Sequence, residues 1–144
     1  MLDTVPRPFL ILGIAGLLPF WGLAILLWFL SGPMLDTALQ AQIAYGAVIL
    51  TFLGGVHWGI ALGQPDHASP LRLCWGVTPS LIGWIAVLLS PGWGLLLLAV
   101  SLALAAIIDR RGIAALEGLA WYGKLRTVLS TGAVSALGVS LLSL

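Results

Sequence analysis

The residues with the greatest potential for chemistry gather in one run, Phe52-Leu-Gly-Gly-Val-His-Trp-Gly59. An imidazole that faced lipid would leave its ring nitrogens without hydrogen-bond partners, so we expect His57 to point into a helix bundle. Three roles remain open for it. It is a neutral packing residue bonded to a hydroxyl or carbonyl, a ligand-binding or proton-relaying group, or a haem or metal ligand.

Polar and indole side chains of other segments are predicted to share the depth of His57. Counted at 1.5 Å per residue, the polar ones lie about 8–10 Å from the helix ends that carry the basic loops. We therefore expect a small polar pocket in one leaflet, open towards the basic side. Its candidate lining residues are His57, Trp58, Trp75, Thr78, Ser101 and Thr131, with Ser130 beside the last of these.

Glycine recurs every four residues on one face of the same segment, at Gly55, Gly59 and Gly63. Small residues at this spacing allow the backbone of another helix to approach closely. We expect this face to pack against a neighbouring helix, either of the same chain or of a second copy in a homo-oligomer.

Signatures of catalysis and of metal binding are absent from the sequence. It contains no Gly-x-Ser-x-Gly elbow, no His-Glu-x-x-His pair and no phosphate-binding glycine loop. The single cysteine, Cys74, and the second histidine, His67, form no metal-ligand spacing with His57. All five acidic residues lie at or beyond the predicted helix ends, so we expect no enzyme, no metal and no cofactor apart from the haem alternative at His57.

The composition indicates whether water or a lipid bilayer surrounds the chain. Of 144 residues, 60% are hydrophobic and 8% are charged, and the mean hydropathy is +1.12. Soluble domains carry about 25% charged residues, so this chain cannot hide its apolar surface in water. A soluble enzyme, a disordered regulator and, with a net charge of +1, a nucleic-acid-binding protein are excluded. The chain must be embedded in a bilayer.

Charges and Pro/Gly clusters divide the chain into apolar stretches that each approach the roughly 20 residues needed to cross a bilayer. We predict an all-α membrane bundle of five transmembrane helices in a single domain, residues 1–144. The predicted helices are 9–30, 39–62, 71–89, 93–108 and 124–144. The fourth is short, and a four-helix count remains an alternative if it only dips into the membrane.

Basic residues indicate the orientation of the bundle. If the N-terminus is cytoplasmic, all six Lys and Arg residues fall on the cytoplasmic side and the C-terminus is periplasmic. The first apolar stretch is too long for a signal-peptide core, and no Arg-rich transit peptide precedes it. We therefore expect a multi-pass protein of the bacterial inner membrane.

Several strings together resemble a known family. They are Pro6-Arg-Pro8, Gly13-Ile-Ala-Gly-Leu-Leu-Pro19, the Gly-Gly-Val-His-Trp-Gly core, Pro79-Ser-Leu-Ile-Gly-Trp84, Asp109-Arg-Arg111 and Trp121-Tyr-Gly-Lys-Leu-Arg126. Over about residues 6–131 the chain resembles the DUF3429 family of small bacterial membrane proteins, which is similar to mitochondrial transmembrane protein 69. The resemblance implies a polytopic membrane protein, associated with energy-transducing membranes, and implies no biochemical activity.

Two functions follow as hypotheses. The first is a non-enzymatic binding, accessory or assembly protein that uses the pocket around His57 to hold a small ligand, a lipid or a membrane-protein partner. The second is a small-solute or proton carrier whose pathway passes His57. A pathway needs polar residues through the whole bilayer, and in the outer half the main candidates are Gln40, Gln42, Tyr45 and Thr51.

Overall fold

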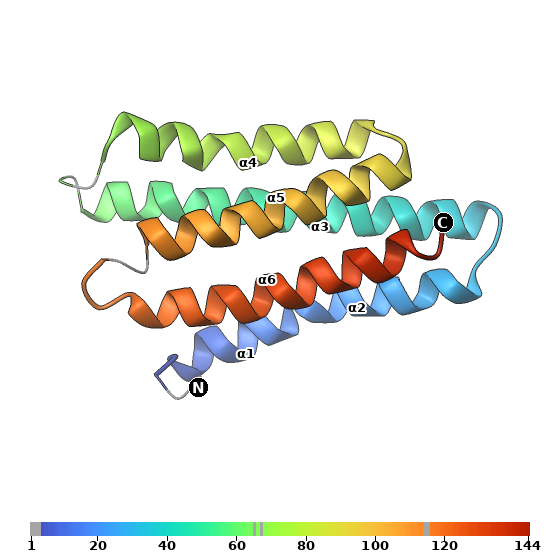
Figure 1. The fold of residues 1–144 in the computed structure, drawn as a ribbon, viewed down its shortest axis with the longest axis horizontal. Helices are drawn as coiled ribbons and strands as arrows, with labels where there is room; N and C mark the ends of the chain where they lie inside the picture. Colours follow the sequence, from blue (N-terminus) through green and yellow to red (C-terminus); the bar gives the residue numbers. More distant parts are fainter. Residues whose placement is uncertain (1–3, 65, 67, 114–115) are drawn as a thin grey trace.

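The computed structural model describes residues 4–64, 66, 68–113 and 116–144. All regular secondary structure in this part of the chain is helical. Figure 1 shows the helices side by side in one bundle, with the two termini at opposite ends. In chain order they are α1 (Arg7–Ala15), α2 (Leu17–Leu26), the 3-10 turn η1 (Leu27–Phe29), α3 (Pro33–Gly63), α4 (Pro70–Leu88), α5 (Pro91–Gly112) and α6 (Ala120–Leu141).

Proline marks the beginning of three consecutive helices, α3, α4 and α5. Pro33, Pro70 and Pro91 occupy the first turns of α3, α4 and α5, where a missing N–H costs no intrahelical hydrogen bond. Ser69 adds a cap to α4, because its hydroxyl accepts a hydrogen bond from the backbone N–H of Arg72 at 3.2 Å. Gly32 turns the chain into α3 with a φ of 58°, a conformation that favours glycine.

The first predicted helix is divided in two. Pro19 lies in the first turn of α2 and cannot donate a hydrogen bond to the carbonyl of Ala15, so the chain changes direction between α1 and α2. Tyr45 of α3 stabilises the backbone at this break, because its hydroxyl donates a hydrogen bond to the Gly16 carbonyl at 2.8 Å. α1, α2 and η1 together still form one apolar stretch, Arg7–Phe29, long enough to cross a membrane.

Packing in the bundle is mostly between antiparallel neighbours. α3 packs against α2, α4 and α5, and α6 packs against α5 and α2 (Figure 1). The central layer is aliphatic, with Leu50, Leu98 and Leu137 at no more than 1% exposure. On the outside, Leu12 and Phe52 are 73% and 70% exposed, which is the distribution expected of helices surrounded by lipid.

Close helix approaches occur on a different glycine face from the predicted one. Within the described part of the chain, a Cβ added at Gly55, Gly59 or Gly63 would meet no atom within 4 Å. A Cβ at Gly54 would instead collide with the Gly76 carbonyl oxygen of α4. The prediction that the Gly55, Gly59 and Gly63 face packs against a helix of the same chain is therefore wrong, because α4 approaches α3 at Gly54, on a neighbouring face.

Four of the helical stretches are long and apolar enough to be membrane spans: Arg7–Phe29, Pro33–Gly63, Pro70–Leu88 and Pro91–Gly112. α6 has a comparable length of 22 residues, or about 33 Å. Its polar content is higher, since its first two turns contain Lys124 and Arg126 and serine and threonine follow. The described part of the chain therefore forms a helical bundle with four stretches that are long and apolar enough to cross a membrane, and α6 is a further long helix.

The largest difference from the predicted boundaries lies between α5 and α6. The predicted fourth helix ended at residue 108 and the predicted fifth began at residue 124, which left a charged connection over 109–123. In the structure α5 continues to Gly112 and α6 begins at Ala120, so Asp109 and Arg126 are both helical and buried. Charged residues were placed in a loop because an unpaired charge is costly in a bilayer, and pairing removes much of that cost.

Candidate functional site

His57 continues the buried face of α3. Its neighbours on this face, Leu50, Gly54 and Ala61, are spaced four, three and four residues apart along the helix, and all are buried. This alternation follows the side of a helix that faces its partners. The prediction that His57 points into the bundle is therefore matched by its position, with a residual exposure of 3%.

A charged network meets His57 in the bundle interior. Its Nε2 lies 2.8 Å from Oδ1 of Asp109 on α5. The other carboxylate oxygen, Oδ2, accepts a hydrogen bond of 2.8 Å from Nε of Arg126 on α6. Nη1 of Arg126 donates in turn to the hydroxyl of Ser130. Three helices thus contribute to one polar cluster, the His57–Asp109–Arg126–Ser130 cluster.

Burial makes this cluster electrostatically demanding. Asp109 is 1% exposed and Arg126 is 4% exposed. Their opposite charges compensate each other, so the cluster is neutral when His57 is neutral and carries one positive charge when His57 is protonated. A buried pair of this kind is tolerated because each charge has a partner, and removing either one leaves the other uncompensated.

The guanidinium of Arg126 is only partly satisfied. Nε and Nη1 have the partners described above, whereas Nη2 is buried and has no hydrogen-bond partner among the described residues. In a bidentate pair both carboxylate oxygens accept from the guanidinium, whereas here one oxygen of Asp109 faces Arg126 and the other faces His57. The cluster therefore keeps a spare donor.

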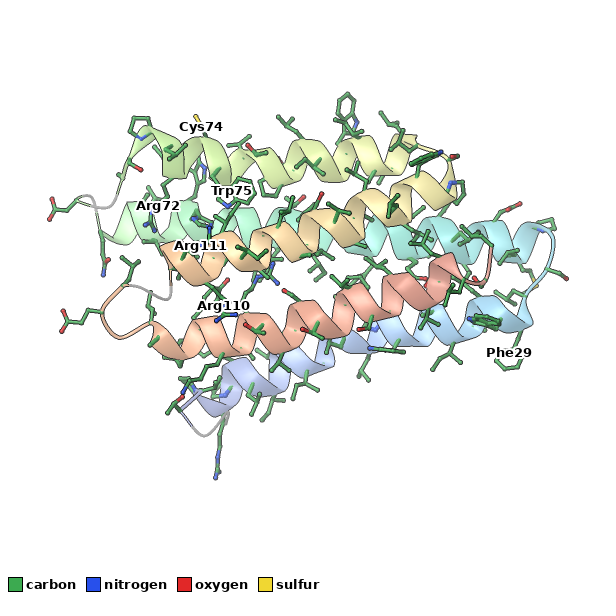
Figure 2. The ribbon with its side chains drawn as sticks, in the orientation of Figure 1. Phe29, Arg72, Cys74, Trp75, Arg110 and Arg111 are labelled. Carbon is green, nitrogen blue, oxygen red and sulfur yellow. The ribbon has the colours of Figure 1, made fainter. Side chains whose placement is uncertain are left out.

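The two tryptophans predicted in the pocket lie away from the charged cluster. Trp58 is 42% exposed, and its indole N–H donates to the Leu73 carbonyl at 3.1 Å. Its ring covers Gly76, where an added Cβ would collide with it. Trp75 is half-buried and packs against the apolar core (Figure 2).

The hydroxyl residues predicted in the pocket are also dispersed. Thr78 donates to the carbonyl of Cys74 at 2.9 Å, within its own helix. Thr131 is exposed and donates to the Thr127 carbonyl at 2.9 Å. Ser101 is buried on α5, about two turns from Asp109. Of the six predicted lining residues, the charged cluster includes His57 alone.

Asp109, Arg126 and Ser130 complete the cluster. The predicted boundaries placed Asp109 just beyond the fourth helix and Arg126 in the first turn of the fifth, and no pairing between them was predicted. A signal for them was present, because both helices repeat buried residues at intervals of three and four. On α5 this face is Leu95, Leu98, Leu102, Ala105 and Asp109. On α6 it is Arg126, Ser130, Ala133, Leu137 and Ser140. Asp109 and Arg126 each lie three or four residues beyond the next buried residue on this face of their own helix, and so extend it.

A second polar group is buried in the opposite half of the bundle. Ser140 donates from its hydroxyl to Oε1 of Gln42 at 2.9 Å, and the Gln42 amide faces the carbonyl of Phe20 at 3.4 Å. Gln42 and Ser140 are both 0% exposed. On α3 this group lies about 22 Å from His57, and the aliphatic layer around Leu50 separates the two.

Basic side chains gather at the end of the bundle where α1, α4 and α6 begin and α5 ends. Figure 2 shows Arg72, Arg110 and Arg111 at this end, with Phe29 at the other. Arg72 is tied to the end of α5, because its Nη2 donates to the Gly112 carbonyl at 3.3 Å. The other basic residues also belong to helix beginnings at this end: Arg7, Lys124 and Arg126.

Comparison with known proteins establishes the family. Residues 5–142 match the family described as "Protein of unknown function (DUF3429)". The chain belongs to this family. The resemblance drawn from the Gly-Gly-Val-His-Trp-Gly core and the accompanying strings is thereby confirmed. The match covers all four members of the charged cluster.

Relatives with a printed name occur in vertebrates. This chain is 36% identical to Transmembrane protein 69 of Xenopus tropicalis over 151 residues. The match covers 99% of this chain and 56% of the frog protein. It is 36% identical to Transmembrane protein 69 of Mus musculus over 92 residues, covering 62% of this chain and 37% of the mouse protein. The chain thus spans about half the length of the frog relative. Its match to the mouse relative covers 37% of that protein's length. No solved structure matches it.

Proposed function

We propose that this chain is a five-span protein of the bacterial inner membrane, in which α6 is the fifth span. Support comes from the length of α6, 22 residues, and from its packing against α5 and α2. Its Lys124 and Arg126 lie in the first two turns, and the rest of the helix carries no charge. The Arg126 charge is compensated by Asp109, which lowers the cost of placing α6 in the bilayer.

The N-terminus is cytoplasmic and the C-terminus periplasmic in this proposal. All six basic residues belong to one end of the bundle, which is the distribution that retains loops in the cytoplasm. The opposite end carries Asp36 at the start of α3 and no Lys or Arg.

The proposed activity is non-enzymatic: the protein binds a ligand or a membrane partner and acts as an accessory or assembly factor. The observation that carries this proposal is the buried His57–Asp109–Arg126–Ser130 cluster. Apolar residues would fill the same volume with equal or greater stability, so ionisable groups in a membrane interior favour a functional role.

Catalysis has little support in the same geometry. A hydroxyl nucleophile needs an adjacent general base, and Ser130 is bonded to the Arg126 guanidinium and not to His57. His57 Nε2 is directed at the Asp109 carboxylate, so we propose no haem or metal at that nitrogen.

Co-purification tests the accessory role. The protein is extracted in a mild detergent, and its oligomeric state, bound lipids and protein partners are determined by native mass spectrometry. We expect a stoichiometric lipid or partner that is reduced with Asp109→Asn and retained with Asp36→Asn, which removes an exposed carboxylate at the other end. A wild-type protein that emerges without lipid or partner contradicts the proposal.

A small-solute or proton carrier is the second candidate, favoured by the polar pairs in both halves of the bundle. The aliphatic layer around Leu50, Leu98 and Leu137 weighs against it, because a proton path needs a continuous series of polar groups. Proteoliposomes containing wild type or His57→Ala provide the test. A carrier requires a flux that depends on the protein and falls in the variant; the accessory role predicts no such flux.

A further inference from the structure

Three hydrogen-bond donors are buried without a partner among the described residues, and all belong to the basic end of the bundle. They are Nη2 of Arg126, the hydroxyl of Tyr122 and Nη1 of Arg72. Buried donors in native proteins are almost always satisfied by protein, water or a bound group. Such a concentration of unsatisfied donors at one end therefore indicates that an acceptor binds there.

Arg126 is the deepest of the three. It is 4% exposed, and its Nε and Nη1 donate to one carboxylate oxygen of Asp109 and to the Ser130 hydroxyl. The remaining carboxylate oxygen is bonded to His57. Nη2 thus needs an acceptor that the described residues do not supply, and a guanidinium binds oxyanions in preference to neutral groups.

Tyr122 lies one turn before Arg126 on the same face of α6, about 6 Å nearer the basic end. Its hydroxyl is within electrostatic reach of both Asp109 and Arg126. A phenol donates a hydrogen bond to an oxyanion, and Tyr122 and Arg126 are four positions apart on α6.

The beginning of α6 adds the field of a helix N-terminus. No side chain caps it, and its first turn contains no acidic residue. The positive end of the helix dipole is therefore not neutralised by the chain itself. Arg110, Arg111 and Lys124 add positive charge to the same end of the bundle, and Glu117 in the connection before α6 adds one negative charge. Arg72 of α4 contacts the end of α5 through the Gly112 carbonyl.

We propose that Arg126 and Tyr122 bind an anionic phosphate group beside the first two turns of α6. The phosphate oxygens accept hydrogen bonds from Arg126 Nη2 and the Tyr122 hydroxyl, while Asp109 holds the guanidinium in place and His57 holds Asp109. This inference rests on the proposed binding function and names its ligand class. The phosphate belongs to a phospholipid headgroup or to free phosphate in the cytoplasm.

Native mass spectrometry of the purified protein tests the site. The protein is exchanged into detergent and offered phosphatidylglycerol, phosphatidylcholine or inorganic phosphate. Arg126→Lys keeps the positive charge beside Asp109 and removes Nη2, and Tyr122→Phe removes the hydroxyl alone. A hydrogen bond to a charged group is worth about 1.5–3 kcal/mol, so each variant should weaken binding by about tenfold or more.

Two matched variants control for general effects. Arg7→Gln removes an exposed charge from the same end of the bundle, and Tyr45→Phe removes a hydroxyl that has a partner in the Gly16 carbonyl. Each should change binding less than twofold. Circular dichroism and thermal unfolding identify any variant that has lost the fold, and the comparison then relies on Tyr122→Phe, which leaves the ion pair intact.

The possible results are distinct. Retention of phosphatidylglycerol over phosphatidylcholine, lost in both site variants, supports a lipid headgroup. Binding of inorganic phosphate with the same residue dependence, without lipid retention, supports the soluble source. Absence of both, or equal binding by wild type and the site variants, overturns the phosphate site. A protein partner found by co-purification in that last case leaves the accessory function standing.

Discussion

Asp109 joins two other helices through its two carboxylate oxygens. One oxygen faces the His57 imidazole and the other the Arg126 guanidinium, both at 2.8 Å. The carboxylate is therefore the only anionic group among the described members of the cluster, and the positions of both partners depend on it.

Asp109→Asn is expected to destabilise the bundle by about 3 kcal/mol or more, because it leaves the Arg126 charge buried without compensation. The free energy of unfolding is measured by detergent titration, with the fluorescence of the seven tryptophans as the signal. Adding Arg126→Gln should restore part of the loss, since the double variant contains neither charge.

Asp36→Asn provides the control for this experiment. Asp36 is exposed at the start of α3, so its loss should change the free energy of unfolding by only about 0.5 kcal/mol. An Asp109→Asn effect as small as the Asp36→Asn effect contradicts the structural role assigned to the carboxylate.

The sequence predicts an inward-facing His57 but not its partner. The ionisable imidazole inside an apolar helix is sufficient to predict burial. Asp109 is adjacent to Arg110 and Arg111, and this charged string is typical of a loop. Whether Asp109 is buried depends on Arg126, 17 residues away, and on the packing of α5 against α6. The pairing of Asp109 with Arg126 therefore depends on how α5 and α6 pack together. The spacing of residues along either helix alone does not specify it.

At the scale of the elements, the proximity of α3 and α4 depends on two glycines. The backbones approach so closely at Gly54 and Gly76 that no side chain fits between them, and the Trp58 ring covers Gly76 from the side. The next residue of α3, Gly55, faces open space among the described residues. Adjacent glycines on one helix thus have opposite packing environments.

Gly54→Ala and Gly55→Ala form a matched pair that tests this arrangement. The first should lower the free energy of unfolding by about 1–3 kcal/mol, because its Cβ displaces α4. The second should leave it unchanged or raise it by up to about 1 kcal/mol, because alanine favours the helix. Equal effects, measured by the same detergent titration, contradict the α3–α4 contact at Gly54.

Helix beginnings follow from the sequence more readily than helix ends. Pro70 and Pro91 lie within two residues of the predicted starts at 71 and 93, because a proline in the first turn is a local signal. The predicted start at 39 is later than the observed start of α3 at Pro33, since Asp36 was interpreted as part of a loop. The end of α5 was missed for the same reason: charge marks a membrane boundary only when it has no partner.

At the scale of the whole molecule, the distribution of basic residues predicts one orientation. In a Cys74→Ser background, single cysteines are introduced at Ser31 and at Ser69, which are exposed at opposite ends of the bundle. A membrane-impermeant maleimide applied to intact spheroplasts should label the Ser31→Cys protein and spare the Ser69→Cys protein.

Permeabilised spheroplasts control for reactivity, and both proteins should be labelled there. Labelling of the Ser69→Cys protein alone in intact spheroplasts would reverse the proposed orientation. Labelling of both sites to equal extents in the intact state would mean that the orientation is mixed.

The ion pair between α5 and α6 also has a consequence for how the chain enters the membrane. A lone Asp or Arg costs about 2.5–3.5 kcal/mol at the centre of an inserting helix, and less towards the helix ends, where Asp109 and Arg126 lie. Asp109 and Arg126 remove this cost from each other only when both helices are present. In the five-span arrangement, the last two helices therefore favour entry as a hairpin. A ribosome that stalled after α5 would leave Asp109 in the translocon without its partner on α6.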